Sequence, residues 1–261
     1  QWGLPQSASG VREFGLRVVD AMSGRVSFAK PQVSFFERFG SEGFRALEDV
    51  IRAAREAGIL VIADAKRGDI GSTMDAYADA WLAPGAPLES DAVTVSPYLG
   101  VGALAGTLET AYAHGKGVFV LATTSNPEAT GLQRSVDETG RTVSQRVIDE
   151  VSAVNAAHTA PDEWGSAGFV VGATVDWRAS GIAPFAPPAP ILAPGFGHQG
   201  AALEDVERIF GSVSETVIMT ESRSILSAGS EMIDSVIEEH TRAARAAWGR
   251  RGSQVQEQNP K

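Results

Sequence analysis

Short apolar runs and longer amphipathic stretches alternate along nearly the whole chain. The apolar runs predict strands at 26–30, 59–64, 91–95, 117–122, 168–172, 190–193 and 216–220. Apolar residues spaced three and four positions apart predict helices at 10–22, 43–57, 73–81, 104–114, 143–155 and 203–210. Alternation of strands with helices is typical of a parallel sheet, and this many repeats favours an α/β TIM (β/α)8 barrel over an open sheet.

The pattern contains seven strands, whereas a barrel of this type has eight. The chain begins with a turn-like segment that leads into a helix, so we expect the first strand to lie upstream of residue 1. One barrel domain is predicted over residues 1–248. A polar tail, residues 249–261, is expected to be disordered. Segments 125–141 and 181–190 are predicted to be loops.

Composition narrows the possible partners and sites. The 261 residues carry a net charge of −10, which argues against binding to the phosphate backbone of a nucleic acid. The chain contains no cysteine, which excludes disulfides, thiolate catalysis and cysteine-ligated metals. No apolar run reaches the length of a membrane span, and the first residues lack the features of a signal peptide. We therefore expect a cytoplasmic protein that has no membrane partner.

The most informative motif stands at the end of the strand predicted at 59–64. Side chains alternate along a strand, so Asp64 and, if the chain stays extended, Lys66 share one face, and Asp69 follows in the loop. An acid and an ammonium group close together keep each other ionised, and a lysine held in this way can donate a proton. A lone Asp-x-Lys pair is equally compatible with a salt bridge that closes the turn. The additional acid, Asp69, favours an active site at this strand end.

Other predicted strand ends add polar groups at the same end of the barrel. Lys30 ends the first visible strand, where the alternative is a solvent-exposed lysine on the rim. Ser125 follows the strand at 117–122 in a segment suited to reading a polar heterocycle or to capping a helix. Glycine-rich turns and forked guanidinium groups bind phosphate, and on this fold phosphate sites recur after the last two strands. The candidates there are Pro194, Gly195, Gly197, Gln199 and Arg223.

The histidines carry less information. His114, His158 and His240 fall in helical or linking segments and are expected to be ordinary surface residues. His198 borders the glycine-rich turn, but neither a carboxylate partner nor metal-ligand spacing accompanies it. The sequence also lacks nucleotide-binding fingerprints and metalloprotease motifs.

Five segments in this order resemble the bacterial orotidine 5'-phosphate decarboxylase family that carries an Asp-Ala-Lys-Arg-Gly-Asp-Ile signature. The segments are 30–37, 64–71, 96–100, 124–128 and 193–195, and the likeness extends from about residue 1 to residue 237. The resemblance implies a decarboxylation of orotidine 5'-phosphate to UMP, in pyrimidine biosynthesis, that needs neither a metal nor a cofactor. It also implies a homodimer with shared active sites.

The resemblance further implies a role for each matching residue. Lys30, Asp64, Lys66 and Asp69 would form an alternating charged array, in which Lys66 protonates C6 and Asp64 lies against the substrate carboxylate. Asp69, Ile70 and Thr73 would reach into the neighbouring subunit's site. Ser125 would contact the pyrimidine, and Gln199 and Arg223 the phosphate. Segments 125–141 and 195–200 are the expected lids. The family's Ile-Asp-Pro segment, whose aspartate contacts the ribose, has no counterpart here.

Two other functions remain open from the sequence. One is a magnesium-dependent sugar-phosphate decarboxylase or lyase of the same superfamily, which should have a further acid where this chain has Lys30. The other is a phosphosugar-binding barrel without catalytic activity. A binding protein of that kind has no need of a lysine between two carboxylates.

Overall fold

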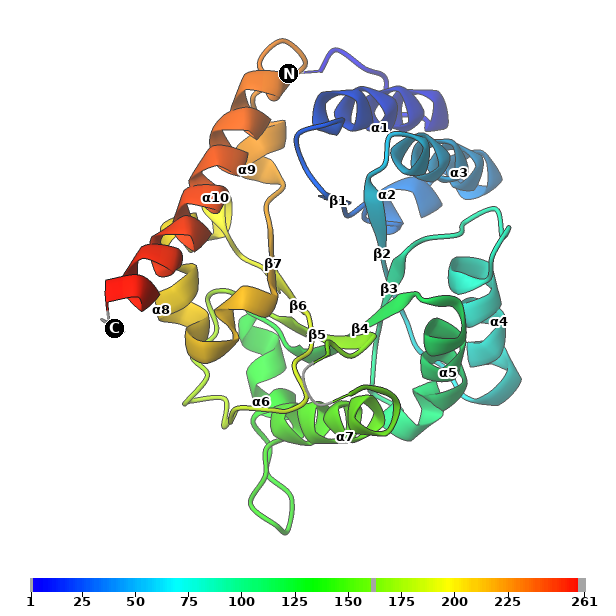
Figure 1. Cartoon of the computed structure of the whole chain (residues 1–261). Helices are drawn as coiled ribbons and strands as arrows, with labels where there is room; N and C mark the ends of the chain where they lie inside the picture. Colours follow the sequence, from blue (N-terminus) through cyan, green and yellow to red (C-terminus); the bar gives the residue numbers. More distant parts are fainter. Residues whose placement is uncertain (1, 161–162, 258–261) are drawn as a thin grey trace.

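The computed structural model describes residues 2–160 and 163–257, with side chains described as far as residue 248. Its seven parallel strands form one curled sheet in the order of the sequence, and helices cover the outer face (Figure 1). The strands are β1 (Phe28–Ala29), β2 (Leu60–Arg67), β3 (Ala92–Val95), β4 (Gly117–Thr123), β5 (Ala167–Val171), β6 (Ile191–Pro194) and β7 (Val217–Thr220). This is the predicted α/β barrel architecture. The strand β1 is shorter than expected, and β2 continues beyond the expected end to Arg67.

The main helices follow the strands around the outside of the sheet. They are α1 (Ala8–Met22), α2 (Ser34–Glu37), α3 (Gly40–Glu56), α4 (Gly71–Leu82), α5 (Ala105–His114), α6 (Thr130–Gln133), α7 (Val143–His158), α8 (Val206–Phe210), α9 (Arg223–Leu226) and α10 (Ile233–Glu257). Short 3-10 turns precede α5, α6 and α8. The sequence pattern did not predict α2, α6, α9 or α10. No helix in the described part of the chain is long and apolar enough to cross a membrane.

Local sequence explains where the longer helices lie. In α3 the buried positions Ala46, Leu47, Val50, Ile51 and Ala54 recur at spacings of three and four, which places one apolar stripe against the sheet. The helices α1 and α7 begin at hydroxyl caps, because the Ser7 and Thr142 side chains accept hydrogen bonds from free backbone N–H groups of the first turn.

The strand alternation separates an inner from an outer face of the sheet. Val61 and Val93 point outward into the large core beneath the helices, whereas Ile62 and Ala92 belong to a small apolar layer inside the barrel. The inner layer is completed by Phe119, Val170 and Leu192. Two residues further along, the inner positions of β2 and β3 are Asp64 and Thr94. A polar layer therefore lies directly on the apolar layer, at the carboxyl ends of the strands.

The sheet has two edges, because β1 and β7 stand at opposite ends of the strand order. Helix α1 and the start of α10 meet beside this opening through Ala21, Ile233 and Ile237. Trp2 joins the contact, and its indole N–H donates to the Leu226 carbonyl oxygen at 2.9 Å. An eighth strand upstream of residue 1 stays a prediction.

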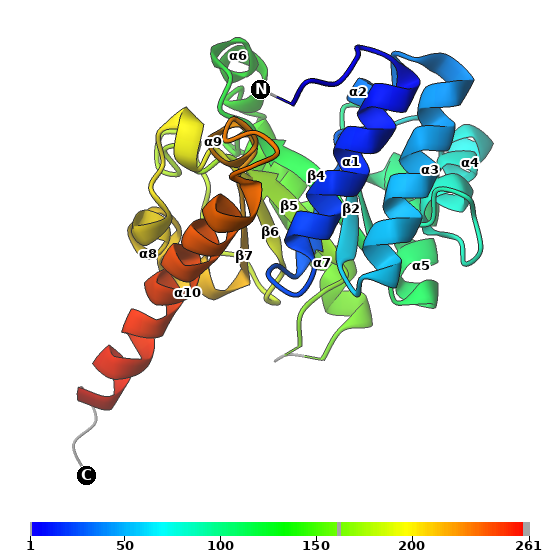
Figure 2. The same cartoon turned by 90° about the horizontal axis from the view of Figure 1, so that it is seen from above.

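The long helix α10 projects from the barrel on the side of β7 and α8 (Figure 2). It continues to Glu257, so residues 249–257 extend this helix, where the sequence analysis placed the start of a disordered tail. Residues 258–261 of the expected tail lie outside the described residues.

Candidate active site

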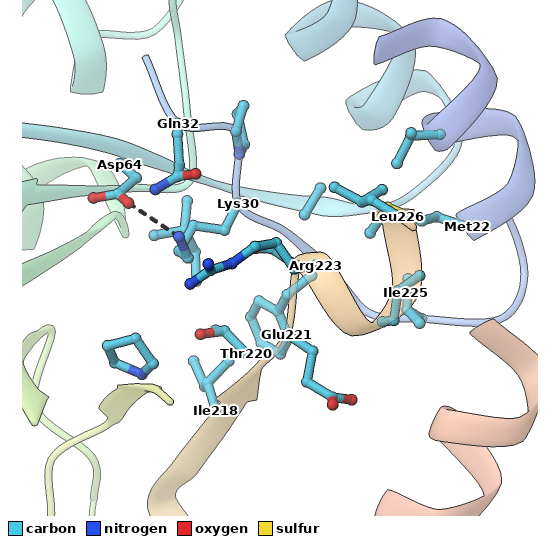
Figure 3. Close-up of a pocket in the computed structure, with 18 of the residues that line it drawn as sticks. Met22, Lys30, Gln32, Asp64, Ile218, Thr220, Glu221, Arg223, Ile225 and Leu226 are labelled. Carbon is cyan, nitrogen blue, oxygen red and sulfur yellow. Dashed lines mark hydrogen bonds and ion pairs between the residues drawn. The ribbon is translucent and has the colours of Figure 1, made fainter. Parts of the chain in front are cut away.

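The carboxyl ends of β1 and β2 bring Lys30, Asp64 and Lys66 together. Lys30 Nζ lies 3.0 Å from one Asp64 carboxylate oxygen (Figure 3). Lys66 Nζ contacts the other oxygen. The Asp64 side chain is 7% exposed and that of Lys30 is 14% exposed, whereas that of Lys66 is 50% exposed and open to the cavity. The predicted acid-lysine cluster is thus a three-membered array with one buried acid between two cations.

Charge balance decides the ionisation of the central acid. Burial by itself would raise the pKa of Asp64, but the ammonium groups of Lys30 and Lys66 together outweigh that effect and hold this pKa below its usual value. Asp64 is therefore a carboxylate at neutral pH.

A bulge in β2 aims the Lys66 side chain. Ala63 pairs with Val93 and Arg67 with Val95, so four steps along β2 match only two steps along β3. Lys66 has a left-handed backbone, with φ of 48°, which residues other than glycine rarely adopt. Bulges of this kind re-aim side chains and are common beside active sites.

Thr94 on β3 holds this bulge in place. Its buried hydroxyl accepts a hydrogen bond from the Lys66 backbone N–H at 2.9 Å and donates to an Asp64 carboxylate oxygen at 3.1 Å. The Thr94 side chain thereby gives the Lys66 N–H the hydrogen-bond acceptor that the strand ladder lacks at the bulge, and it also orients the Asp64 carboxylate. Thr94 was not among the predicted site residues, although it points inward like Asp64 and lies at the end of a predicted strand.

A cavity of about 1520 Å³ opens above the array. Ser125, Pro194, Gly195, Gln199 and Arg223 all line it, as does His198. The Arg223 side chain extends across the cavity toward Lys30 (Figure 3). The volume exceeds that of most ligand cavities, about 300–1,000 Å³, because the lining also includes residues of α1, α10 and the two edge strands β1 and β7.

Four of the predicted site residues do not line this cavity. Asp69, Ile70 and Thr73 lie on the loop after β2 and the start of α4, where the Asp69 carboxylate accepts from the Ile70 backbone N–H at 2.8 Å. Gly197 lies behind the cavity wall, packed against Glu221 and Ser224. Within one chain, the structure therefore does not bring these four residues to the array.

The short helix α6 contacts the loop that follows β4. In α6, the Gln133 side-chain oxygen Oε1 accepts from the Thr124 backbone N–H at 2.9 Å, and its Nε2 donates to the Thr124 hydroxyl at 3.0 Å. These bonds tie the segment predicted as a loop to the neighbour of Ser125. The sequence analysis missed Gln133, since this contact joins two loop positions with no shared pattern.

Comparison with known proteins shows which family this chain belongs to. The orotidine 5'-phosphate decarboxylase / HUMPS family model matches residues 12–234. A curated orotidine 5'-phosphate decarboxylase from Salinispora tropica is 52% identical over 89% of this chain and 82% of its own length. One from Corynebacterium efficiens is 49% identical over 88% of this chain and 81% of its own. This chain belongs to the orotidine 5'-phosphate decarboxylase / HUMPS family.

Solved structures agree with this family assignment. The Leishmania donovani OMP decarboxylase matches with a TM-score of 0.76 and 31% identity, over 93% of this chain and 90% of that one. A crystal structure of a Streptomyces avermitilis protein matches with a TM-score of 0.85 and 43% identity, over 94% and 85% of the two chains. The predicted TIM-barrel fold and the predicted family are both confirmed.

Two histidines of this family member have specific partners. His240 on α10 lies with Nδ1 2.6 Å from a carboxylate oxygen of the buried Glu221. The His158 ring stacks on Tyr112 at 4.4 Å between ring centroids. A backbone hydrogen bond to Val154, with Glu109 nearby, raises the His158 pKa above its usual value. His158 is exposed at the surface, as expected. The expectation was wrong for His240, whose partner Glu221 is buried and lies 19 positions away in the sequence.

The described residues contain no group of three or more His, Cys, Asp or Glu side chains that could hold a metal ion. The acid required by the magnesium-dependent reading is also missing, since Lys30 occupies that strand end and is paired with Asp64.

Proposed function

We propose that this protein decarboxylates orotidine 5'-phosphate to UMP, with neither metal nor cofactor, as a step of pyrimidine biosynthesis. The observation that carries the proposal is the Lys30–Asp64–Lys66 array at the mouth of the barrel cavity. The curated relatives named orotidine 5'-phosphate decarboxylase, about half identical over most of the chain, support the same substrate.

The array suits the difficulty of this reaction. When the bond between C6 and the carboxylate breaks, its electron pair stays on C6 in an orbital that the pyrimidine ring cannot delocalise. Carbon dioxide leaves, and Lys66 Nζ supplies the proton that forms the new C6–H bond. Lys30 and Lys66 stabilise the developing negative charge, because fixed charges in a water-poor site are usually the largest catalytic contribution. Asp64 faces the substrate carboxylate and destabilises it relative to the product.

The other side of the cavity suits the nucleotide phosphate. Arg223 and Gln199 supply donors, the turn at Pro194 and Gly195 brings the backbone close, and Ser125 contacts the pyrimidine. Contacts to the phosphate, far from C6, contribute binding energy that orders the lid segments around α6 and residues 195–200. Affinity and chemistry would thus come from opposite walls of the same cavity.

We further propose a homodimer in which Asp69, Ile70 and Thr73 complete the partner's site. These three residues lie outside the cavity of their own chain. Beside them the surface is apolar, with Ile70 62%, Tyr98 76% and Leu99 52% exposed. The loops that carry them touch, since a Cβ on Gly68 would lie 2.7 Å from the Ser96 carbonyl oxygen. Apolar patches of this kind on a surface mark association sites.

An activity assay tests the function directly. Purified protein with EDTA present should convert orotidine 5'-phosphate to UMP at full rate, followed by the absorbance change of the pyrimidine. A rate that requires added magnesium would favour the sugar-phosphate lyase alternative. No turnover at any condition, with nucleotide still bound, would favour a binding protein.

Subunit mixing tests the shared sites. Lys66→Ala and Asp69→Ala proteins should each be inactive, but their mixture should recover activity, because each heterodimer holds one intact site and one doubly damaged site. Random exchange makes half of the dimers mixed, so at most about a quarter of the parental sites return. Inactivity of a mixture whose exchange has been demonstrated, or an active monomer in light scattering, would remove Asp69 from the partner's site.

A further inference from the structure

A buried carboxylate directly after β7 connects three elements. The Glu221 side chain is 6% exposed. One of its oxygens lies 2.6 Å from His240 Nδ1 on α10, and the other lies 3.1 Å from the Ser224 hydroxyl on α9. Because a carboxylate only accepts hydrogen bonds, the imidazole N–H and the hydroxyl are the donors.

The glycine-rich turn after β6 rests on the same carboxylate. A Cβ built on Gly197 would lie 2.2 Å from Glu221 Oε1 and 2.6 Å from the Ser224 hydroxyl oxygen. Gly197 also has a φ of 66°, a conformation that suits glycine. The turn can therefore lie this close to Glu221 only because residue 197 has no side chain.

Glu221 does not itself face the cavity centre. Its carboxylate turns away from the array, whereas Arg223, two residues later, extends toward Lys30 (Figure 3). An anion so placed cannot bind a phosphate, since like charges repel. The geometry leaves Glu221 behind the two segments that carry Gln199 and Arg223.

We propose that Glu221, with His240 and Ser224, is a positioning residue that locks both phosphate-binding segments in their binding geometry. The proposal rests on the proposed function. Helix α9 has four residues, too few to be stable alone, so its contacts must hold Arg223 in place. The carboxylate fixes α9 through Ser224, the turn through Gly197, and both to α10 through His240.

The test is the preference of Glu221→Gln for a phosphorylated substrate. The amide keeps the size of the carboxylate but removes its charge and one of its two acceptors. We expect kcat/KM for orotidine 5'-phosphate to fall about 10- to 100-fold, the size expected when a binding group is misplaced. For orotidine, which lacks the phosphate, kcat/KM should change less than about threefold. Calorimetry should show a loss of affinity for UMP of about 10- to 100-fold as well.

The chain offers a matched control and a rescue. Glu109→Gln breaks the other carboxylate-histidine pair, with His158, far from the cavity, and should leave both substrates unaffected. His240→Ala should reproduce the Glu221→Gln loss in part, and His240→Asn, which keeps a donor near Nδ1, should restore it. The His240 variants decide the question if Glu221→Gln fails to fold.

A double variant tests whether Glu221 affects phosphate binding through Arg223. In an Arg223→Ala background, Glu221→Gln should weaken UMP binding by less than about threefold more, because residues that act through one another are not additive. Equal losses for orotidine and its phosphate, or full additivity, would overturn the positioning role. If the parent protein does not decarboxylate orotidine 5'-phosphate, the proposed function is wrong instead. The affinity of the parent and of Glu221→Gln for inorganic phosphate then tests the positioning role, and equal affinities would overturn it.

Discussion

Glu89 lies between two cations at the amino ends of β3 and β4, and Asp64 lies between two others at the carboxyl ends of β1 and β2. Glu89 Oε1 is 2.8 Å from both Lys116 Nζ and an Arg55 guanidinium nitrogen, and Glu89 Oε2 accepts from the Gly85 N–H at 2.8 Å. These contacts lower the Glu89 pKa to about 2, the Lys116 hydrogen bond most of all. Each cluster places one carboxylate between two cations, and the clusters stand at opposite ends of the barrel.

The clusters differ in what completes them. At the amino ends, the Lys116 and Glu89 side chains are 10% and 11% exposed, and every charge meets a partner in the chain. At the carboxyl ends, Lys66 is half exposed and stands on a left-handed backbone, a conformation that costs about 1–3 kcal/mol. The first cluster is closed and stabilises the fold. The second leaves space for a ligand and needs supports such as Thr94.

The largest expected effect is on activity and concerns the cluster at the carboxyl ends of the strands. Lys66→Ala should lower decarboxylation about 10⁴-fold or more, because a general acid alone contributes about 10²–10⁴-fold and a stabilising charge is lost with it. The melting temperature should stay within a few degrees of the parent, since the side chain is half exposed. Steady-state kinetics and thermal unfolding measure both. Activity within tenfold of the parent would remove Lys66 from the mechanism.

Glu89→Gln should have the opposite profile. It leaves Lys116 buried without its nearest anion, which we expect to lower the free energy of unfolding by about 3 kcal/mol at pH 7. The kcat/KM should remain that of the parent. Urea unfolding provides the measurement. Glu56→Gln, which breaks an exposed pair with Arg52, is the control and should cost less than about 0.5 kcal/mol.

The Glu89 effect should depend on pH in a known direction. Its folded pKa of about 2 lies below the ordinary value of 4.5, so its stabilising contribution is present above about pH 4.5 and is lost as the pH falls toward 2. The difference between parent and Glu89→Gln should therefore shrink over that range. A difference that stays constant from pH 7 to pH 3 would show that packing, not charge, dominates at this cluster.

The parts of these clusters that could be predicted from sequence are those encoded in one local segment. Asp64 and Lys66 follow one apolar strand within three residues, so the local motif predicts their contact, although the bulge at Lys66 and not regular alternation aims the lysine. The role of Thr94 depends on the β2–β3 register, which a bulge shifts, and no local pattern encodes that shift. The Glu221–His240 pair joins residues 19 positions apart across α9. Asp69, Ile70 and Thr73 do not line the cavity of their own chain, so their role in a partner's site stays a prediction.

The smallest effect tests whether the open cluster depends on its support. Thr94→Val keeps the shape of the side chain but removes the donor to Asp64 and the acceptor for the Lys66 N–H. We expect kcat to fall roughly ten- to hundredfold, since a hydrogen bond to a charged group contributes about 1.5–3 kcal/mol. Thr94→Ser keeps the hydroxyl and should restore most of the rate.

Thr107→Val is the matched control, because the Thr107 hydroxyl is buried and has no hydrogen-bond partner among the described residues. That change should be neutral or stabilising and leave kcat unaltered. If Thr94→Val lowered stability but not kcat, Thr94 would belong with the closed cluster, as a fold-stabilising residue that happens to lie beside the site.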